Sequence, residues 1–123
     1  MMQYFKYIIN DIPPSNNQYM GNSNSFRKYS KEKEKWHWLI KAALRHKPIN
    51  PLDKAIVKIT YFFKDNRRHD PDNYSGKFIL DPLVKEGVIC DDSFKVISLK
   101  LEQGGVDKNN PRTEIEVIEI EDI

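Results

Sequence analysis

Residues 55–63 read AIVKITYFF, and the chain continues through residues 64–66 into RRHDPDN at residues 67–73. Apolar and polar side chains alternate along residues 55–63, as they do in a strand with one buried face. This is the strongest strand signal in the chain. The strand leads directly into a run of bases and acids that few fold requirements explain. We therefore interpret the rest of the chain around Asp70 and Asp72.

Three further strands are expected from the same kind of pattern. Residues 4–9 are aromatic and β-branched and run toward Pro13 and Pro14. Residues 96–102 alternate, residues 103–111 are expected to form a hairpin loop, and residues 113–120 should be its partner strand. The apolar positions of that last strand shift phase near Ile118, which predicts a bulge or a strand end there.

Two helices are expected between these strands. An apolar stripe with helical spacing predicts the first over residues 30–46, with Ser30 as the N-cap and Pro48 preventing continuation. The second is expected to begin with Asp70 as N-cap and Pro71 at the first helical position, and to end at Gly87 in a left-handed conformation. Pro82 should kink or restart it. Asp81 would then cap a second short helix and need not touch a metal.

Length and composition predict one soluble globular domain over residues 1–123, with 39% hydrophobic and 31% charged residues. The net charge is only +2, but residues 26–68 carry thirteen Lys and Arg against four Asp and Glu. A segregated positive surface suits a nucleic-acid backbone, although a solvated helix face gives the same count. One cysteine, Cys90, excludes an internal disulfide, and no secretion signal or apolar membrane span is expected. These features fit the cytoplasm.

The acids permit a more specific hypothesis. Asp70 and Asp72 follow the strand, and Asp91 and Asp92 come about twenty residues later. Aspartate oxygens that bind two hard divalent cations are suited to phosphodiester hydrolysis. A lysine close by, here Lys77, would stabilise the negative charge that develops on the phosphate.

Plainer readings of the same residues stand beside this one. The acids can simply cap a helix, and the arginines at the strand end can simply keep the surface soluble. Asp70, Asp72 and Asp81 fall at positions one, three and twelve of a calcium-binding EF-hand loop, but the glycine position of that loop holds Ser75. Cys90 has no partner placed for nucleophilic catalysis, and we expect a buried thiol.

Four motifs in this order resemble the RusA-type Holliday junction resolvases. They are PPSNN at residues 13–17, RRHDPDN at 67–73, KFILDPL at 77–83 and GVICDDS at 87–93. The resemblance covers most of the chain. It implies an α/β (α+β mixed) fold with one mixed β-sheet in βαβαββ order and helices packed on the sheet.

The resemblance also implies function. Members are small homodimeric endonucleases that cut four-way DNA junctions with Mg²⁺ or Mn²⁺, which suggests a bacterial or bacteriophage source. Matched by position, Asp70, Asp72, Asp91 and Asp92 become catalytic metal ligands and Lys77 a catalytic residue at the phosphate. The residues expected to contact DNA are Arg67, Arg68, His69, Asn73, Asn16, Asn17, Arg27 and Lys28. A DNA-binding protein without catalytic activity, or a less specific metal-dependent nuclease, remains an alternative.

Overall fold

The computed structural model describes residues 2–15, 25–67, 74 and 76–121. Its elements follow the expected βαβαββ order. They are β1 (Tyr4–Ile9), α1 (Ser25–Ala43), β2 (Ala55–Phe63), α2 (Lys77–Lys85), β3 (Ile97–Val106) and β4 (Arg112–Glu119). Within the described ranges, no helix has the length and apolar character that a membrane span requires.

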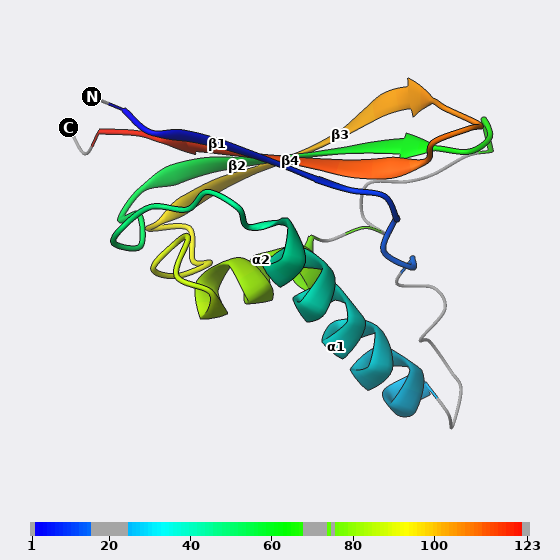
Figure 1. Cartoon of the computed structure of the whole chain (residues 1–123), viewed down its shortest axis with the longest axis horizontal. Helices are drawn as coiled ribbons and strands as arrows, with labels where there is room; N and C mark the ends of the chain where they lie inside the picture. Colours follow the sequence, from blue (N-terminus) through cyan, green and yellow to red (C-terminus); the bar gives the residue numbers. More distant parts are fainter. Residues whose placement is uncertain (1, 16–24, 68–73, 75, 122–123) are drawn as a thin grey trace.

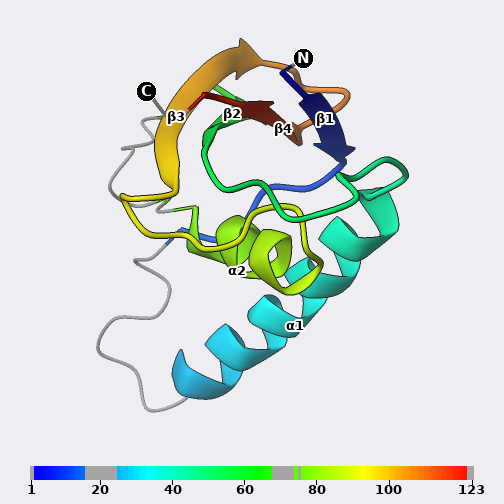
Figure 2. The ribbon, with the colours of Figure 1, turned by 90° about the vertical axis from the view of Figure 1, so that its left-hand side faces the viewer.

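The four strands form one mixed sheet in the order β1-β4-β2-β3. β3 runs parallel to β2, whereas β4 is antiparallel to both β1 and β2. Both helices lie on the same side of the sheet (Figures 1 and 2). A parallel neighbour requires a crossover connection, and the segment that contains α2 supplies it between β2 and β3. The expected fold class is therefore confirmed.

The core lies between the sheet and the helices. Val57 and Ile59 of β2 point inward from alternate positions and are fully buried. Trp36 of α1 and Ile79 and Leu83 of α2 are fully buried as well. Burial of an apolar side chain of this size contributes about 1.5–3 kcal/mol relative to exposure. The predicted apolar stripe of α1 is thus core packing.

The first helix differs from its expected bounds at both ends. α1 begins at Ser25, so Ser30 lies inside the helix and is not its N-cap, and α1 ends at Ala43 instead of His46. The stripe begins at Tyr29, and serine is a common N-cap, so the pattern favoured a later start. Ser30 is exposed, and a solvated serine is tolerated in a helix.

The second helix begins later than expected. α2 starts at Lys77, and its N-cap is Gly76 with φ 77°, so the expected start at Pro71 is wrong. Asp70 lies outside the described residues and precedes Lys77 by too many positions to cap α2. The helix also continues through Pro82 without a restart. Asp81 therefore lies within α2 and caps nothing there; its carboxylate is 3.8 Å from Lys33 Nζ of α1.

The end of α2 is confirmed. Gly87 has φ 79°, and its N–H donates to the Val84 carbonyl at 3.1 Å. The Val88 N–H donates to the Leu83 carbonyl at 2.9 Å. These two bonds form a Schellman motif, which satisfies carbonyls that the helix end would leave free.

The third strand is longer than expected. β3 continues to Val106, so only residues 107–111 connect it to β4. The expected hairpin is wrong, because β2 lies between β3 and β4 in the sheet and β4 pairs with β1 and β2. The register with β2 shifts between Tyr61 and Phe62, and Gly104 is the extra residue on β3. A Cβ at Gly104 would lie 2.4 Å from Phe62 Cζ, so glycine lets the Phe62 ring lie over the strand. β4 itself pairs regularly and ends at Glu119, which is the strand end that the phase shift predicted.

Candidate functional site

The expected site residues divide into two groups. Those outside the described residues are Asn16, Asn17, Arg68, His69, Asp70, Asp72 and Asn73. Those that the structure describes are Arg27, Lys28, Arg67, Lys77, Asp91 and Asp92. The described group shows what surrounds the central motif.

A pocket of about 430 Å³ brings two of the sequence motifs together. One wall comes from residues 10–15, which follow β1. The other comes from Phe63, the last residue of β2, and from Lys64, Asp65 and Arg67 beyond it. These walls are about fifty residues apart in the sequence. Tyr74 and Pro111 complete the lining. Residues 13–15 and Arg67, each from a different motif, therefore face one hollow.

The wall that follows β1 is held in place by hydrogen bonds. The hydroxyl of Thr113, a fully buried residue of β4, donates to the Asp11 carbonyl at 2.7 Å. The Asp11 carboxylate accepts from the Ile12 N–H at 2.8 Å and binds Lys35 Nζ at 2.8 Å. Hydrogen bonding to Asp11 raises the pKa of Lys35. The loop is thereby tied to the central part of the sheet and to α1.

The wall that follows β2 presents a cation. Asp65 accepts a hydrogen bond from the Arg67 N–H at 3.1 Å, and its second oxygen is 3.4 Å from Arg67 Nε. An aspartate that binds the backbone two residues later forms an Asx turn. The Arg67 side chain is still 81% exposed. Its guanidinium can therefore bind an anion from solvent.

Tyr74 packs on the end of β2. Its ring centroid lies 5.4 Å from that of Tyr61 and 5.6 Å from that of Phe63. Burial raises the pKa of Tyr61 and of Tyr74, so both phenols are neutral at physiological pH. Arg67 and Tyr74 flank positions 68–73 in the sequence, and both line the pocket.

Lys77 is the first residue of α2 and does not line this pocket. Its ammonium lies 5.0 Å from the centroid of the Tyr29 ring, where a cation–π interaction is favourable. Hydrogen bonding to Tyr29 raises the pKa of Lys77. The side chain is exposed and carries a positive charge at neutral pH.

Asp91 and Asp92 lie elsewhere. Both are exposed, in the segment that joins α2 to β3. The Leu52 N–H donates to the Val88 carbonyl, and the Cys90 N–H donates to the Leu52 carbonyl. These two bonds hold residues 88–90 beside the segment that leads into β2. The two acids therefore lie toward the end where β2 begins, whereas the pocket lies where β2 ends. Cys90 is exposed, so the expectation of a buried thiol is wrong.

Within the described ranges, no cluster of three or more His, Cys, Asp or Glu side chains could hold a metal ion. His37 pairs with Glu86 at 3.0 Å. Sequence reasoning missed Asp65, Thr113 and Tyr74. The Asx-turn spacing of Asp65 and Arg67 was a readable signal. The contacts of Thr113 and Tyr74 arise only from the tertiary fold.

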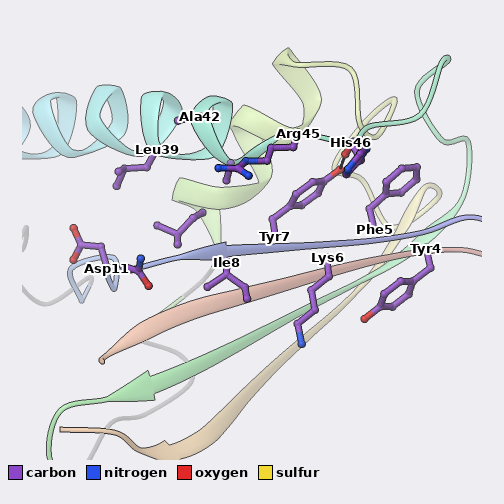
Figure 3. A pocket seen from close by; sticks show the side chains of 13 residues that line it. Tyr4, Phe5, Lys6, Tyr7, Ile8, Asp11, Leu39, Ala42, Arg45 and His46 are labelled. Atoms are coloured by element: carbon purple, nitrogen blue, oxygen red, sulfur yellow. Dashed lines mark hydrogen bonds between the residues drawn. The ribbon is translucent and has the colours of Figure 1, made fainter. Parts of the chain in front are cut away.

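A larger hollow of about 760 Å³ lies between β1 and the C-terminal part of α1 (Figure 3). Phe5, Tyr7 and Leu39 contribute apolar surface to it, and Arg45 and His46 close one end. The Tyr7 hydroxyl donates to the His46 carbonyl at 2.6 Å, and burial raises the pKa of Tyr7 to about 12. Asp11 is the one acidic residue among the described residues that line this hollow, so it does not resemble a metal site.

Comparison with known proteins identifies the family. No curated protein matches the chain. The family model described as endodeoxyribonuclease RusA matches residues 11–118. This range includes all four sequence motifs and every residue that lines the smaller pocket except Asn10. The resemblance carried by those motifs is confirmed, and the chain belongs to the endodeoxyribonuclease RusA family.

Proposed function

We propose that this protein is a divalent-metal-dependent endonuclease that resolves four-way DNA junctions, acting as a homodimer in the cytoplasm of a bacterium or of a phage-infected cell. Its single domain would span residues 1–123. Family membership supports the nuclease chemistry. The observation that carries the proposal within this chain is the pocket where residues 13–15 face Arg67 and Tyr74. In the sequence, Arg67 and Tyr74 flank the segment that contains Asp70 and Asp72.

The donor set fits a hard cation. Asp70 and Asp72 offer carboxylate oxygens, which Mg²⁺ and Mn²⁺ prefer over nitrogen or sulfur. Asp91 and Asp92 offer the same oxygens but lie toward the end where β2 begins, so they form a second acid pair apart from the pocket beside Arg67. Asp91 and Asp92 are exposed and make no ion pair with another described residue. Bound metal ions would supply an activated hydroxide and stabilise the leaving oxygen.

The remaining roles fall to the bases. Arg67 and Arg68 would hold a phosphate beside the pocket by bidentate hydrogen bonds. Lys77 would place its ammonium near the charge that develops on the phosphate, and its raised pKa keeps it protonated. Asn16, Asn17, His69 and Asn73 would add polar contacts to the DNA strand.

Cleavage of a labelled four-way junction and of the matching linear duplex tests the proposal. In Mg²⁺ or Mn²⁺, we expect paired nicks in the junction alone, and none in EDTA. Asp72→Asn should reduce the rate at least about 100-fold, since a lost ligand costs more than a lost supporting contact. Asp91→Asn and Asp92→Asn test the second acid pair. Glu102→Gln, which removes an exposed acid paired with Lys58 at 3.3 Å, is the matched control and should cleave normally.

The alternatives predict different results. A DNA-binding protein without catalytic activity would bind the junction in Mg²⁺ or Mn²⁺ and leave it intact, and Asp72→Asn would change nothing. A less specific nuclease would cut the linear duplex as fast as the junction. Either result would replace the proposed activity.

A further inference from the structure

The outward face of α1 is basic along its whole length. Exposed bases recur on the solvent-exposed side of the helix, namely Arg27, Lys28, Lys31, Lys35 and Lys41. Glu34 is the acid on the same face. Lys35 already pairs with Asp11, but Arg27, Lys28 and Lys31 make no ion pair with another described residue. We call this set of residues the basic face of α1.

Trp38 lies at the centre of the basic face. At 3.6 residues per turn, Trp38 projects between Lys31 and Lys41 and about opposite Trp36. Trp36 is fully buried, whereas the Trp38 side chain is 59% exposed. Packing therefore explains the first tryptophan and not the second. Lys41 Nζ lies 5.2 Å from the Trp38 ring centroid, and the His37 ring meets it edge-on at 6.2 Å.

An aromatic ring among exposed bases is the combination that binds single-stranded nucleic acid. The basic side chains follow the phosphates of the strand, and unpaired nucleobases stack on the aromatic ring. A continuous duplex offers no free base face, because each base is already stacked on its neighbours. A ring in this position therefore favours a strand that presents an unpaired base. The distance from Arg27 to Lys41 is about 21 Å along the helix axis, which is enough for several phosphates of one strand.

We propose that the basic face of α1 binds DNA at an unpaired stretch, where Trp38 stacks on a base and the flanking Arg and Lys side chains bind phosphates. The inference rests on DNA as the substrate of the proposed function. It adds a binding surface that lies apart from the pocket beside Arg67. Its role is to hold the unpaired or branched part of the substrate.

Binding of the full-length protein to labelled DNA in EDTA tests this without any cleavage. The probes are a 20-nucleotide single strand and the matching duplex. Trp38→Ala should weaken single-strand binding about 10-fold and duplex binding less than twofold. Trp38→Phe retains a ring and should restore most of the affinity. Ile49→Ala, which removes a side chain that is 99% exposed, is the control for loss of exposed apolar surface.

Lys31→Ser tests the phosphate contacts. It should lower the slope of log affinity against log salt by about 0.7 for the single strand, the value expected for one lost phosphate contact. Lys100→Ser removes an exposed lysine from β3 and should leave the slope unchanged. Single-stranded DNA should also quench the fluorescence of exposed Trp38 in the wild type, whereas buried Trp36 should not respond.

The inference is overturned if Trp38→Ala binds the single strand like the wild type, or if DNA leaves the fluorescence unchanged. Quenching by anionic lipid vesicles but not by DNA would overturn it as well and would assign the face to a membrane surface. Because binding is measured in EDTA, loss of the proposed cleavage activity would not affect the result. Circular dichroism confirms that each variant is folded.

Discussion

At the scale of single residues, Thr113 connects the core to the candidate site. Its buried hydroxyl donates to the Asp11 carbonyl, which belongs to the wall of the pocket beside Arg67. Thr113→Val keeps the shape but leaves that carbonyl without its partner. We expect the free energy of unfolding to fall by about 1–2 kcal/mol and the Ile12 amide to exchange faster. Urea denaturation and hydrogen exchange measure the two effects.

Thr113→Ser is the matched control for that change. It keeps the hydroxyl and removes only a methyl group, so it should preserve the protection of the Ile12 amide. If Thr113→Val protects Ile12 as well as the wild type does, the hydrogen bond does not hold the loop.

Residue chemistry predicts what the site would bind, but it does not predict what surrounds the site. Bases beside Asp70 and Asp72 indicate metal and phosphate chemistry wherever the chain places them. Residues 13–15 and Arg67 come together only in the tertiary fold, and no local sequence pattern predicts that they face one pocket. The resemblance expected both motifs to contribute, and the pocket shows that their described parts are neighbours.

At the scale of elements, Gly76 sets the start of α2 against the sheet. Gly76 and Gly87 both have positive φ, so alanine is strained at either position by about 1 kcal/mol. A Cβ at Gly76 would also lie 3.2 Å from Ile59 Cδ1, whereas a Cβ at Gly87 would lie 3.9 Å from Pro51 Cγ, an ordinary van der Waals contact. We expect Gly76→Ala to destabilise the protein more than Gly87→Ala does, in thermal and urea denaturation. If the two variants lose the same free energy of unfolding, the Ile59 side chain moves aside without an energetic cost.

Strands were easier to predict than helix ends. The bounds of β1 and β2 match the sequence pattern. In β2, buried positions alternate from Ala55 to Phe63, so the pattern marks both ends of the strand. The start of α2 was misplaced because Asp70-Pro71 has the chemistry of a helix start, while the actual start follows Gly76. β3 was cut short because Gly104-Gly105 reads as a turn. Only the neighbouring Phe62 ring shows why a glycine belongs within that strand.

At the scale of the whole molecule, the sheet order depends on contacts between distant parts of the chain. β4 is the last strand in sequence but lies between β1 and β2. Alternation shows which face of a strand is buried but does not identify its neighbours, so residues 96–102 and 113–120 were wrongly paired as a hairpin and the order of strands in the sheet was not predicted. Closing the sheet brings Tyr4 beside Ile118, and this joins the two ends of the fold.

This order predicts a gradient of stability across the sheet. β2 and β4 are paired on both sides, whereas β1 and β3 are edge strands within one chain. Amides of Val57, Ile59, Ile115 and Val117 should exchange only by global unfolding, and those of the edge strands at least about tenfold faster. Hydrogen exchange followed at two protein concentrations measures this. The gradient is contradicted if the amides of β1 are as well protected as those of β4 and if their protection rises with protein concentration. That result would indicate that β1 pairs with a second chain in the proposed homodimer.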